Sequence, residues 1–425
     1  MIYRLDLCNY HDTKRGEAVC QGGFLRYAFP ALRSIRDISG PVFTPNYPYH
    51  DDAFTLLSTP ERTGALPAYT GRGVVIAFID SGFYPHPDLG DRVLAHVDAT
   101  TSQITEGRRF ASARDYSWHG QMTSVIACGD GRLSGGRYRG IASEAQLVLI
   151  KVSDLNGRIK EPDILRGLRW LINNHHRFNV RVCNISVGGD DESDLPAHPL
   201  HRAVRVLVDA GVTVTVAAGN SGRRLLLPPA SAAAAITVGG VDDRNTADRT
   251  CWEIYPNAFG TAHDGTTKPE VIGPAAWIAS PILPGSSMAR EARWLAPMLR
   301  AGDRAAVGRL LLSGHGDLSI PRAQAIQPDA RVYEMLQKRI HAHKLVDAQH
   351  QHVDGTSVSS AILASIVAQM LEARPALTPA QVRAILTATA WPLPGVPPER
   401  QGAGVVDAAA AIRMAVEHTG RERGL

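Results

Sequence analysis

Short apolar runs rich in β-branched residues alternate with helix-like patterns along most of this 425-residue chain. Four of these runs have the length and composition of strands buried on both faces of a parallel sheet: 74–79 (VVIAFI), 147–152 (LVLIKV), 180–185 (VRVCNI) and 212–217 (VTVTVA). Between them, residues 164–172 carry apolar side chains at helical spacing, and 201–210 is predicted to be a helix that ends at Gly211. The alternation predicts an α/β fold, a doubly wound, mostly parallel sheet with helices on both faces. Ligands of such sheets bind at the carboxyl ends of the strands, so the functional site is expected there.

Composition excludes several classes of protein. The hydrophobic content of 44% is enough for a large core, and no uninterrupted apolar run approaches the roughly 18 residues of a membrane-spanning helix. The N-terminal residues contain no continuous apolar segment like that of a signal peptide, so we expect a cytoplasmic protein. The net charge of +4 is interspersed along the chain, which argues against a nucleic-acid partner. Five cysteines without a CxxC pair favour a reducing compartment, although a bridge between Cys8 and Cys20 stays open.

Three short segments contain residues suited to catalysis. Asp80 directly follows the first apolar run, where a carboxylate is either functional or the cap of the next turn. His119 precedes a short helix-like stretch, and a single histidine is more often structural than catalytic. Ser357 precedes a run, 358–371, that is apolar nearly all round and is predicted to be a buried helix. Its hydroxyl is either an N-cap or lies where the positive end of a helix dipole would stabilise an oxyanion.

The order Asp80, His119, Ser357 is one of the chain orders in which a Ser-His-Asp triad occurs. With the blocks around these residues, the chain resembles the subtilisin-like serine peptidases, the subtilase family. The resembling blocks run in the family's order from about residue 70 to 418: 71–89, 119–127, 140–152, 186–189 (SVGG), 217–222 (AAGNSG), 268–275, 355–361 (GTSVSSA), 377–390 and 402–411. Three residues depart from the family pattern: Gln121, Met122 and Ala361. The related sedolisins use a carboxylate as base and Asp at the position of Asn220, so His119 and Asn220 argue against them.

The resemblance implies a serine endopeptidase that acts through an acyl-enzyme intermediate. Ser357 would attack the peptide carbonyl, His119 would carry the proton, and Asp80 would orient the imidazole. Asn220 and the backbone N–H of Ser357 would bind the oxyanion. A polypeptide substrate would add as a β-strand to 152–157 and 186–188, and the implied substrate-binding residues are Ser186, Val187, Gly188, Ala217, Ala218, Gly219, Asn156 and Gly157. Two alternatives stay open, a catalytically silent subtilase fold that binds or regulates, and an esterase with the same triad.

The extent of the resemblance sets the predicted domain boundaries. Residues 70–418 form the peptidase domain, 1–69 an N-terminal extension or a short pro-segment removed by cleavage, and 419–425 a C-terminal tail. Residues 284–352 are predicted to be a helical insertion before the nucleophile helix, with two helices over 292–311 and 330–346. A loop this long is more often functional than idle, so we expect a lid or a docking surface for a regulatory partner, with a passive elaboration as the alternative.

Metal binding and substrate specificity are less constrained. We expect no required cofactor and assign no metal ligand, although subtilases often bind structural Ca²⁺. Segment 130–136 (DGRLSGG) has too few carboxylates for a calcium cage, and two His-x-His pairs, at 341–343 and 350–352, are better explained as part of a polar segment. Gly189 is followed by four acidic residues, Asp190, Asp191, Glu192 and Asp194. They would either select basic substrate residues or form a solvated loop, in which Arg223 and Arg224 could neutralise them by pairing.

Overall fold

The computed structural model describes residues 41–51, 53–101, 104–107, 114–189 and 195–417. These residues separate into two compact units. The core unit contains residues 58–278 and 354–417, and the helical unit contains residues 41–57 and 279–353. Residues 1–40 of the predicted N-terminal extension, the predicted tail 419–425 and the acidic residues at 190–194 lie outside the described residues.

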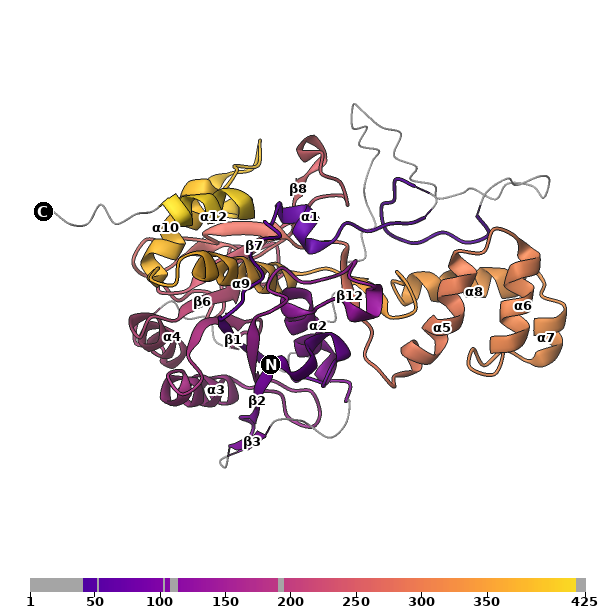
Figure 1. Cartoon of the computed structure of the whole chain (residues 1–425), viewed down its shortest axis with the longest axis horizontal. Coiled ribbons are helices and arrows are strands. Elements are labelled where there is room, and N and C mark those ends of the chain that lie inside the picture. The colour runs from indigo at the N-terminus through magenta and orange to yellow at the C-terminus, as the bar shows by residue number, and fades with distance from the viewer. Residues whose placement is uncertain (1–40, 52, 102–103, 108–113, 190–194, 418–425) are drawn as a thin grey trace, which may run out of the picture. The chain divides into compact units, whose positions relative to one another are not determined.

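A nine-stranded sheet forms the centre of the core unit (Figure 1). The strand order is β11-β7-β6-β5-β1-β4-β2-β3, with β8 beside β7, and every pairing is parallel except β2 with β3 and β7 with β8. The strands are β1 (Val75–Asp80), β2 (Val93–Asp98), β3 (Thr105–Gly107), β4 (Gln146–Lys151), β5 (Val180–Ile185), β6 (Thr213–Ala217), β7 (Ile236–Asp242), β8 (Glu253–Ile254) and β11 (Val271–Pro274). The four predicted apolar runs coincide with β1, β4, β5 and β6.

Helices cover both faces of this sheet, which confirms the predicted doubly wound α/β fold (Figure 1). On one face, α3 (Glu161–Asn174) and α4 (Pro199–Asp209) pack against each other and against β1 and β6. On the other, α9 (Thr356–Ala373) lies across β5, β6, β7 and β11, with α2 (Ser117–Cys128) and α12 (Ala408–Glu417) packed on it. The remaining elements are α1 (Thr59–Thr63), α10 (Pro379–Thr389), α11 (Pro398–Gln401), the 3-10 helices η1 (Pro87–Arg92), η2 (Arg132–Ser134) and η3 (Arg249–Cys251), and the paired strands β9 (Gly260–Thr261) and β10 (Thr267–Lys268).

Helix α9 is apolar nearly all round because the core encloses it. Among the described residues it is the one helix long and apolar enough to cross a membrane, yet 83% of it is buried inside the protein. Its burial on the sheet, between α2 and α12, explains the composition without a bilayer.

Strand alternation decides which side chains face which helical layer. Val75, Ala77 and Ile79 of β1 belong to the apolar cluster that contains Ile164 and Leu168 of α3. Because successive side chains of a strand point to opposite faces, Asp80 faces the layer of α2 and α9.

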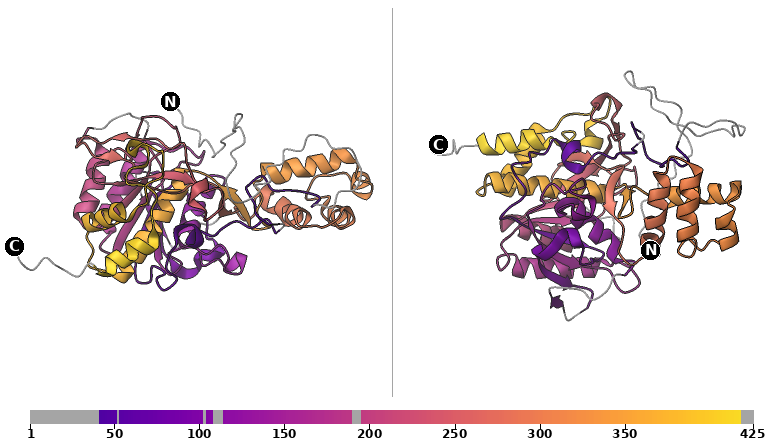
Figure 2. Two further views of the ribbon diagram at one scale, coloured as in Figure 1. Left: turned by 90° about the horizontal axis from the view of Figure 1, so that it is seen from above. Right: turned by 45° about the vertical axis from the view of Figure 1, so that its right-hand side comes forward.

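The helical unit contains four helices where the sequence predicted two: α5 (Ser287–Leu299), α6 (Arg304–Gly314), α7 (Arg322–Ile326) and α8 (Ala330–Ala342). These helices lie side by side in both views of Figure 2. The helical pattern over 292–311 is divided because Asp303 caps α6, its side chain accepting a hydrogen bond from the backbone N–H of Ala306. Strands β12 (Ile278–Pro281) and β13 (His350–Val353) pair with each other.

The cysteines follow the sequence prediction only in part. Cys128 and Cys183 are free and fully buried, and burial raises the pKa of the Cys128 thiol to about 12. Cys251 is disulfide-bonded, a departure from the free thiols expected in a reducing compartment.

Candidate active site

The carboxyl ends of three adjacent parallel strands assemble the site. Asp80 is the last residue of β1, Ser186 directly follows β5, and Asn220 lies three residues after β6. The sheet order β6-β5-β1 makes these strands neighbours, about 4.8 Å apart. Residues far apart in the sequence therefore meet at one edge of the sheet.

Asp80 is completely buried, and three donors satisfy its carboxylate. Oδ1 accepts from the backbone N–H of Ser81 at 2.6 Å and from His119 Nδ1 at 2.6 Å. Oδ2 accepts from the hydroxyl of Thr123 at 2.9 Å. If Asp80 only capped the next turn, its bond to the Ser81 N–H would be sufficient. The additional bond to His119 means that the carboxylate also orients this imidazole.

His119 lies in the first turn of α2, with 8% of its surface exposed. Because the Asp80 carboxylate can only accept, Nδ1 carries the proton and Nε2 is left as an acceptor. Burial by itself lowers the pKa of His119, but the charge of Asp80 and its hydrogen bond outweigh burial and raise this pKa above its usual value. The following residue must be glycine, since a Cβ on Gly120 would overlap the carbonyl oxygen of Gly82.

Ser357 is the second residue of α9 and is half-buried. The N-cap is Gly355, whose φ of 138° suits glycine, so of the two alternatives for Ser357 the N-cap is wrong. The backbone carbonyl of Ser357 accepts a hydrogen bond from the Ser186 hydroxyl at 3.3 Å. Within the described residues, the Ser357 hydroxyl makes no hydrogen bond, and neither does Nε2 of His119. Each is therefore free to act on a substrate, and catalytic contacts often tighten only when substrate binds.

The amide of Asn220 has a fixed orientation. Its Oδ1 accepts from the backbone N–H of Thr356 at 2.9 Å and from the Thr356 hydroxyl at 3.0 Å. The same hydroxyl accepts from the backbone N–H of Gly219 at 3.0 Å. Because a backbone N–H can only donate, the oxygen of Asn220 must face α9. Asn220 is an exposed residue, and its NH₂ group is left without a partner among the described residues.

The predicted substrate-binding residues lie after β5, at the end of β6 and in the turn at 154–157. In the segment that follows β5, the backbone N–H groups of Val187 and Gly188 have no hydrogen-bond acceptor among the described residues, as expected for an edge that pairs with an added strand. Ala217 and Ala218 lie at the end of β6 beside Gly219. Asn156 and Gly157 differ, because their N–H groups are already bonded to Asp154 within one turn.

The sequence prediction did not single out several residues that hold this site together. Thr123 binds Asp80, Thr356 binds Asn220, and the fully buried Asn184 and Ser360 bind each other. The one signal that could have identified Asn184 is a polar residue between two apolar residues near the end of a predicted strand. The three departures from the family pattern, Gln121, Met122 and Ala361, are fully buried.

The histidines of the helical unit have separate partners. His343 bonds to Glu291 and His350 to Asp347, while His341 bonds to Thr44 and Gln337. The described residues contain no group of three or more His, Cys, Asp or Glu that could hold a metal ion.

Comparison with known proteins identifies the family. Residues 71–407 match the Subtilase family. The chain is 29% identical over 352 residues to Serine protease AprX of Bacillus subtilis (strain 168), covering 80% of this chain and 66% of that protein. It is 33% identical over 181 residues to Subtilisin BL of Lederbergia lenta, covering 41% of this chain and 58% of that protein. It thus spans less than two thirds of each relative.

Solved structures show the same fold. A mutant of the protease domain of PatA has a TM-score of 0.57 at 19% identity and covers 83% of this chain and 99% of its own. Fervidolysin from Fervidobacterium pennivorans, a keratinolytic enzyme related to subtilisin, has a TM-score of 0.57 at 19% identity, with coverages of 84% and 45%. The protein therefore has a subtilisin-like α/β fold. The chain belongs to the subtilase family.

Proposed function

We propose that the chain is a serine endopeptidase with Ser357 as its nucleophile. The observation that carries the proposal is the bond from His119 Nδ1 to buried Asp80, which leaves Nε2 as a proton acceptor at the strand ends where α9 begins. Ser357 Oγ would attack the peptide carbonyl carbon while its proton passes to Nε2. The imidazolium would give this proton to the leaving amine, and water would then release the acyl group by the reverse sequence.

Asn220 and the amino end of α9 would stabilise the oxyanion. The NH₂ group of Asn220 is free because Thr356 occupies the amide oxygen. The backbone N–H of Ser357, in the first turn of α9, has no acceptor among the described residues, as is usual for the first N–H groups of a helix. Removing one such donor costs about 3–4 kcal/mol of transition-state stabilisation.

A labelling experiment tests the proposal. A fluorophosphonate probe should label the wild type and not Ser357→Ala, and the same wild-type preparation should hydrolyse peptides before it is labelled. Ester turnover without peptide turnover would instead identify an esterase. Absence of labelling in the wild type, after any activation treatment, would identify a catalytically silent subtilase that binds or regulates.

The proposed reaction takes both its nucleophile and its proton carrier from side chains, so we propose that no cofactor is required. We propose separately that the protein acts in the cytoplasm, and the disulfide-bonded Cys251 is the observation that opposes this. Turnover should be unchanged by EDTA, and activity should follow the cytoplasmic fraction of the cells. Loss of activity in EDTA with recovery in Ca²⁺ would point to a structural calcium site instead.

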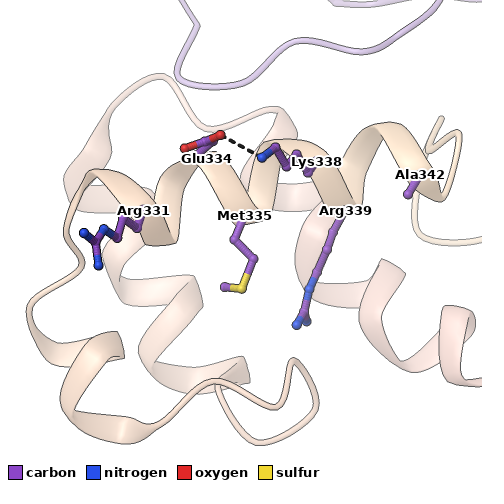
Figure 3. A pocket seen from close by; sticks show the side chains of 6 residues that line it. All are labelled: Arg331, Glu334, Met335, Lys338, Arg339 and Ala342. Atoms are coloured by element: carbon purple, nitrogen blue, oxygen red, sulfur yellow. Dashed lines mark ion pairs between the residues drawn. The ribbon is translucent and has the colours of Figure 1, made fainter.

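The helical unit is proposed as a lid or as a docking surface for a regulatory partner. Residues 41–57 and 279–353 together contain ten Lys or Arg and eight Asp or Glu, a small basic excess that favours an acidic partner. A groove of about 410 Å³ is lined by side chains of α8. Figure 3 shows Met335 and Arg339 pointing to one side of this helix and the Glu334–Lys338 ion pair on the other. Replacing 284–351 by a Gly/Ser linker should raise turnover of large folded substrates more than that of a tripeptide ester. If both rates move together, or neither moves while the fold survives, the unit is not a gate.

A further inference from the structure

A buried chain of hydrogen bonds connects the central sheet to the proposed nucleophile. It begins at Ser360 on α9, whose hydroxyl lies 2.7 Å from Oδ1 of Asn184 on β5. Nδ2 of Asn184 lies 2.9 Å from the Ser186 hydroxyl, which lies 3.3 Å from the backbone carbonyl of Ser357. Thr215 on β6 adds a second donor to Asn184 Oδ1, at 3.2 Å.

The direction of every bond in this chain is determined by its last acceptor. The Ser357 carbonyl can only accept, so the single Ser186 proton points to it and the Ser186 oxygen must accept from Asn184. The NH₂ group of Asn184 therefore faces Ser186, and its oxygen faces the hydroxyls of Ser360 and Thr215. Because all donors point one way, each bond polarises the next.

Burial makes the chain rigid. Asn184, Thr215 and Ser360 are completely buried and Ser186 is 6% exposed, so water does not compete for these groups. Strand alternation explains how they meet: Cys183 and Ile185 belong to the cluster on the α3 side, so Asn184 between them faces α9. Ser360 lies three residues after Ser357, on the same side of the helix.

We infer that Asn184 is a positioning residue for Ser357. Through Ser186 it holds the first turn of α9, and with it the Ser357 backbone N–H and hydroxyl, at the carboxyl end of β5. This inference rests on the proposed function, because its effect is measured on the reaction of Ser357. Small displacements of a reacting group are costly, since misplacement by about 1 Å can cost about a hundredfold in rate.

Two neighbouring serines provide a matched pair of variants. Ser359 and Ser360 are both completely buried on α9, and each donates one bond of 2.7 Å, Ser359 to the carbonyl of Gly239 and Ser360 to Asn184. Ser359→Ala and Ser360→Ala should lower the melting temperature by similar amounts. Only Ser360→Ala removes a bond of the chain, the shorter of the two that hold the Asn184 oxygen, so only this variant should slow the reaction of Ser357.

The test is a double-mutant cycle with Ser186→Ala, read as the second-order rate of fluorophosphonate labelling together with kcat and KM for a peptide. In the wild-type background, Ser360→Ala should lower the labelling rate and kcat about tenfold and change KM less than about twofold. In the Ser186→Ala background the chain is already cut, so Ser360→Ala should lower the labelling rate and kcat less than about twofold. Ser359→Ala should change the rate less than about twofold in both backgrounds.

Four outcomes would overturn the inference. One is an equal effect of Ser360→Ala in both backgrounds, and another is a rate loss in Ser359→Ala that matches the loss in Ser360→Ala. Absence of labelling in the wild type would overturn the proposed function and this inference with it, whereas labelling of the wild type with an unchanged rate in Ser360→Ala overturns the inference alone.

Discussion

Replacement of Asp80 by asparagine should remove a charge while the local hydrogen bonds remain. Oδ1 receives two N–H donors, from Ser81 and His119, so the amide oxygen of the new side chain should stay at that position. Its NH₂ group would then face the Thr123 hydroxyl, which can accept this bond and donate to the carbonyl of Gly120, 3.1 Å away. Asp80→Asn should therefore fold, and His119 should keep its proton on Nδ1.

The loss of charge should be costly in the transition state. With an effective dielectric constant of about 20, Coulomb's law gives an attraction of about 6 kcal/mol between a carboxylate and an imidazolium at the 2.6 Å separation of Oδ1 and Nδ1. One factor of ten in rate corresponds to about 1.4 kcal/mol. We therefore expect the loss of about 6 kcal/mol in Asp80→Asn to lower kcat by about 10⁴-fold.

The assay is the rate of fluorophosphonate labelling and peptide turnover as a function of pH. Burial would lower the pKa of His119 once the opposing charge is gone, so the acid limb of the profile should move to lower pH. Thr123→Val keeps the charge and removes one hydrogen bond to Asp80, so it should cost less than about tenfold. A loss below tenfold in Asp80→Asn, or an equal loss in Thr123→Val, would refute the reasoning.

Three further predictions concern stability and the oxyanion site. Folding raises the pKa of His119, so its contribution to stability is complete below the unfolded value of about 6.5 and is lost as pH rises through the folded value. The difference in melting temperature between wild type and Asp80→Asn should shrink with rising pH, and a difference that stays flat from about pH 6 to 9 would contradict this sign. Asn220→Ala should lower kcat by about 10²–10³-fold and stability by about 1 kcal/mol, because the Thr356 N–H loses its acceptor; an unchanged kcat excludes Asn220 from the oxyanion site. Gly120→Ala should destabilise the fold by about 3 kcal/mol in denaturant unfolding, because the added Cβ would meet the Phe83 ring at 2.8 Å and overlap the Gly82 carbonyl. An unchanged midpoint of denaturant unfolding would contradict this and show that α2 can shift to make room.

The strands and the buried helix could be predicted because their signals are local. Each apolar run that forms β1, β4, β5 or β6 is buried on both faces, and this burial leaves a continuous pattern in a few residues. The same holds for α9, which is apolar nearly all round because it is enclosed. Helix boundaries were less certain, because a single cap such as Asp303 divides one helical pattern into α5 and α6.

What the sequence by itself determined is the order of chemically capable residues along the chain, Asp80, His119 and Ser357, and the strands or helices that carry them. Only the tertiary structure decided which of their atoms meet. His119 is 39 residues from Asp80, and Ser360 is 176 residues from Asn184, so neither hydrogen bond leaves a pattern in any local window. Each contact depends on which side of the sheet a strand residue faces, and alternation along the strands turns these polar side chains toward α2 and α9. It also depends on the order of the strands in the sheet, which places β1, β5 and β6 next to one another.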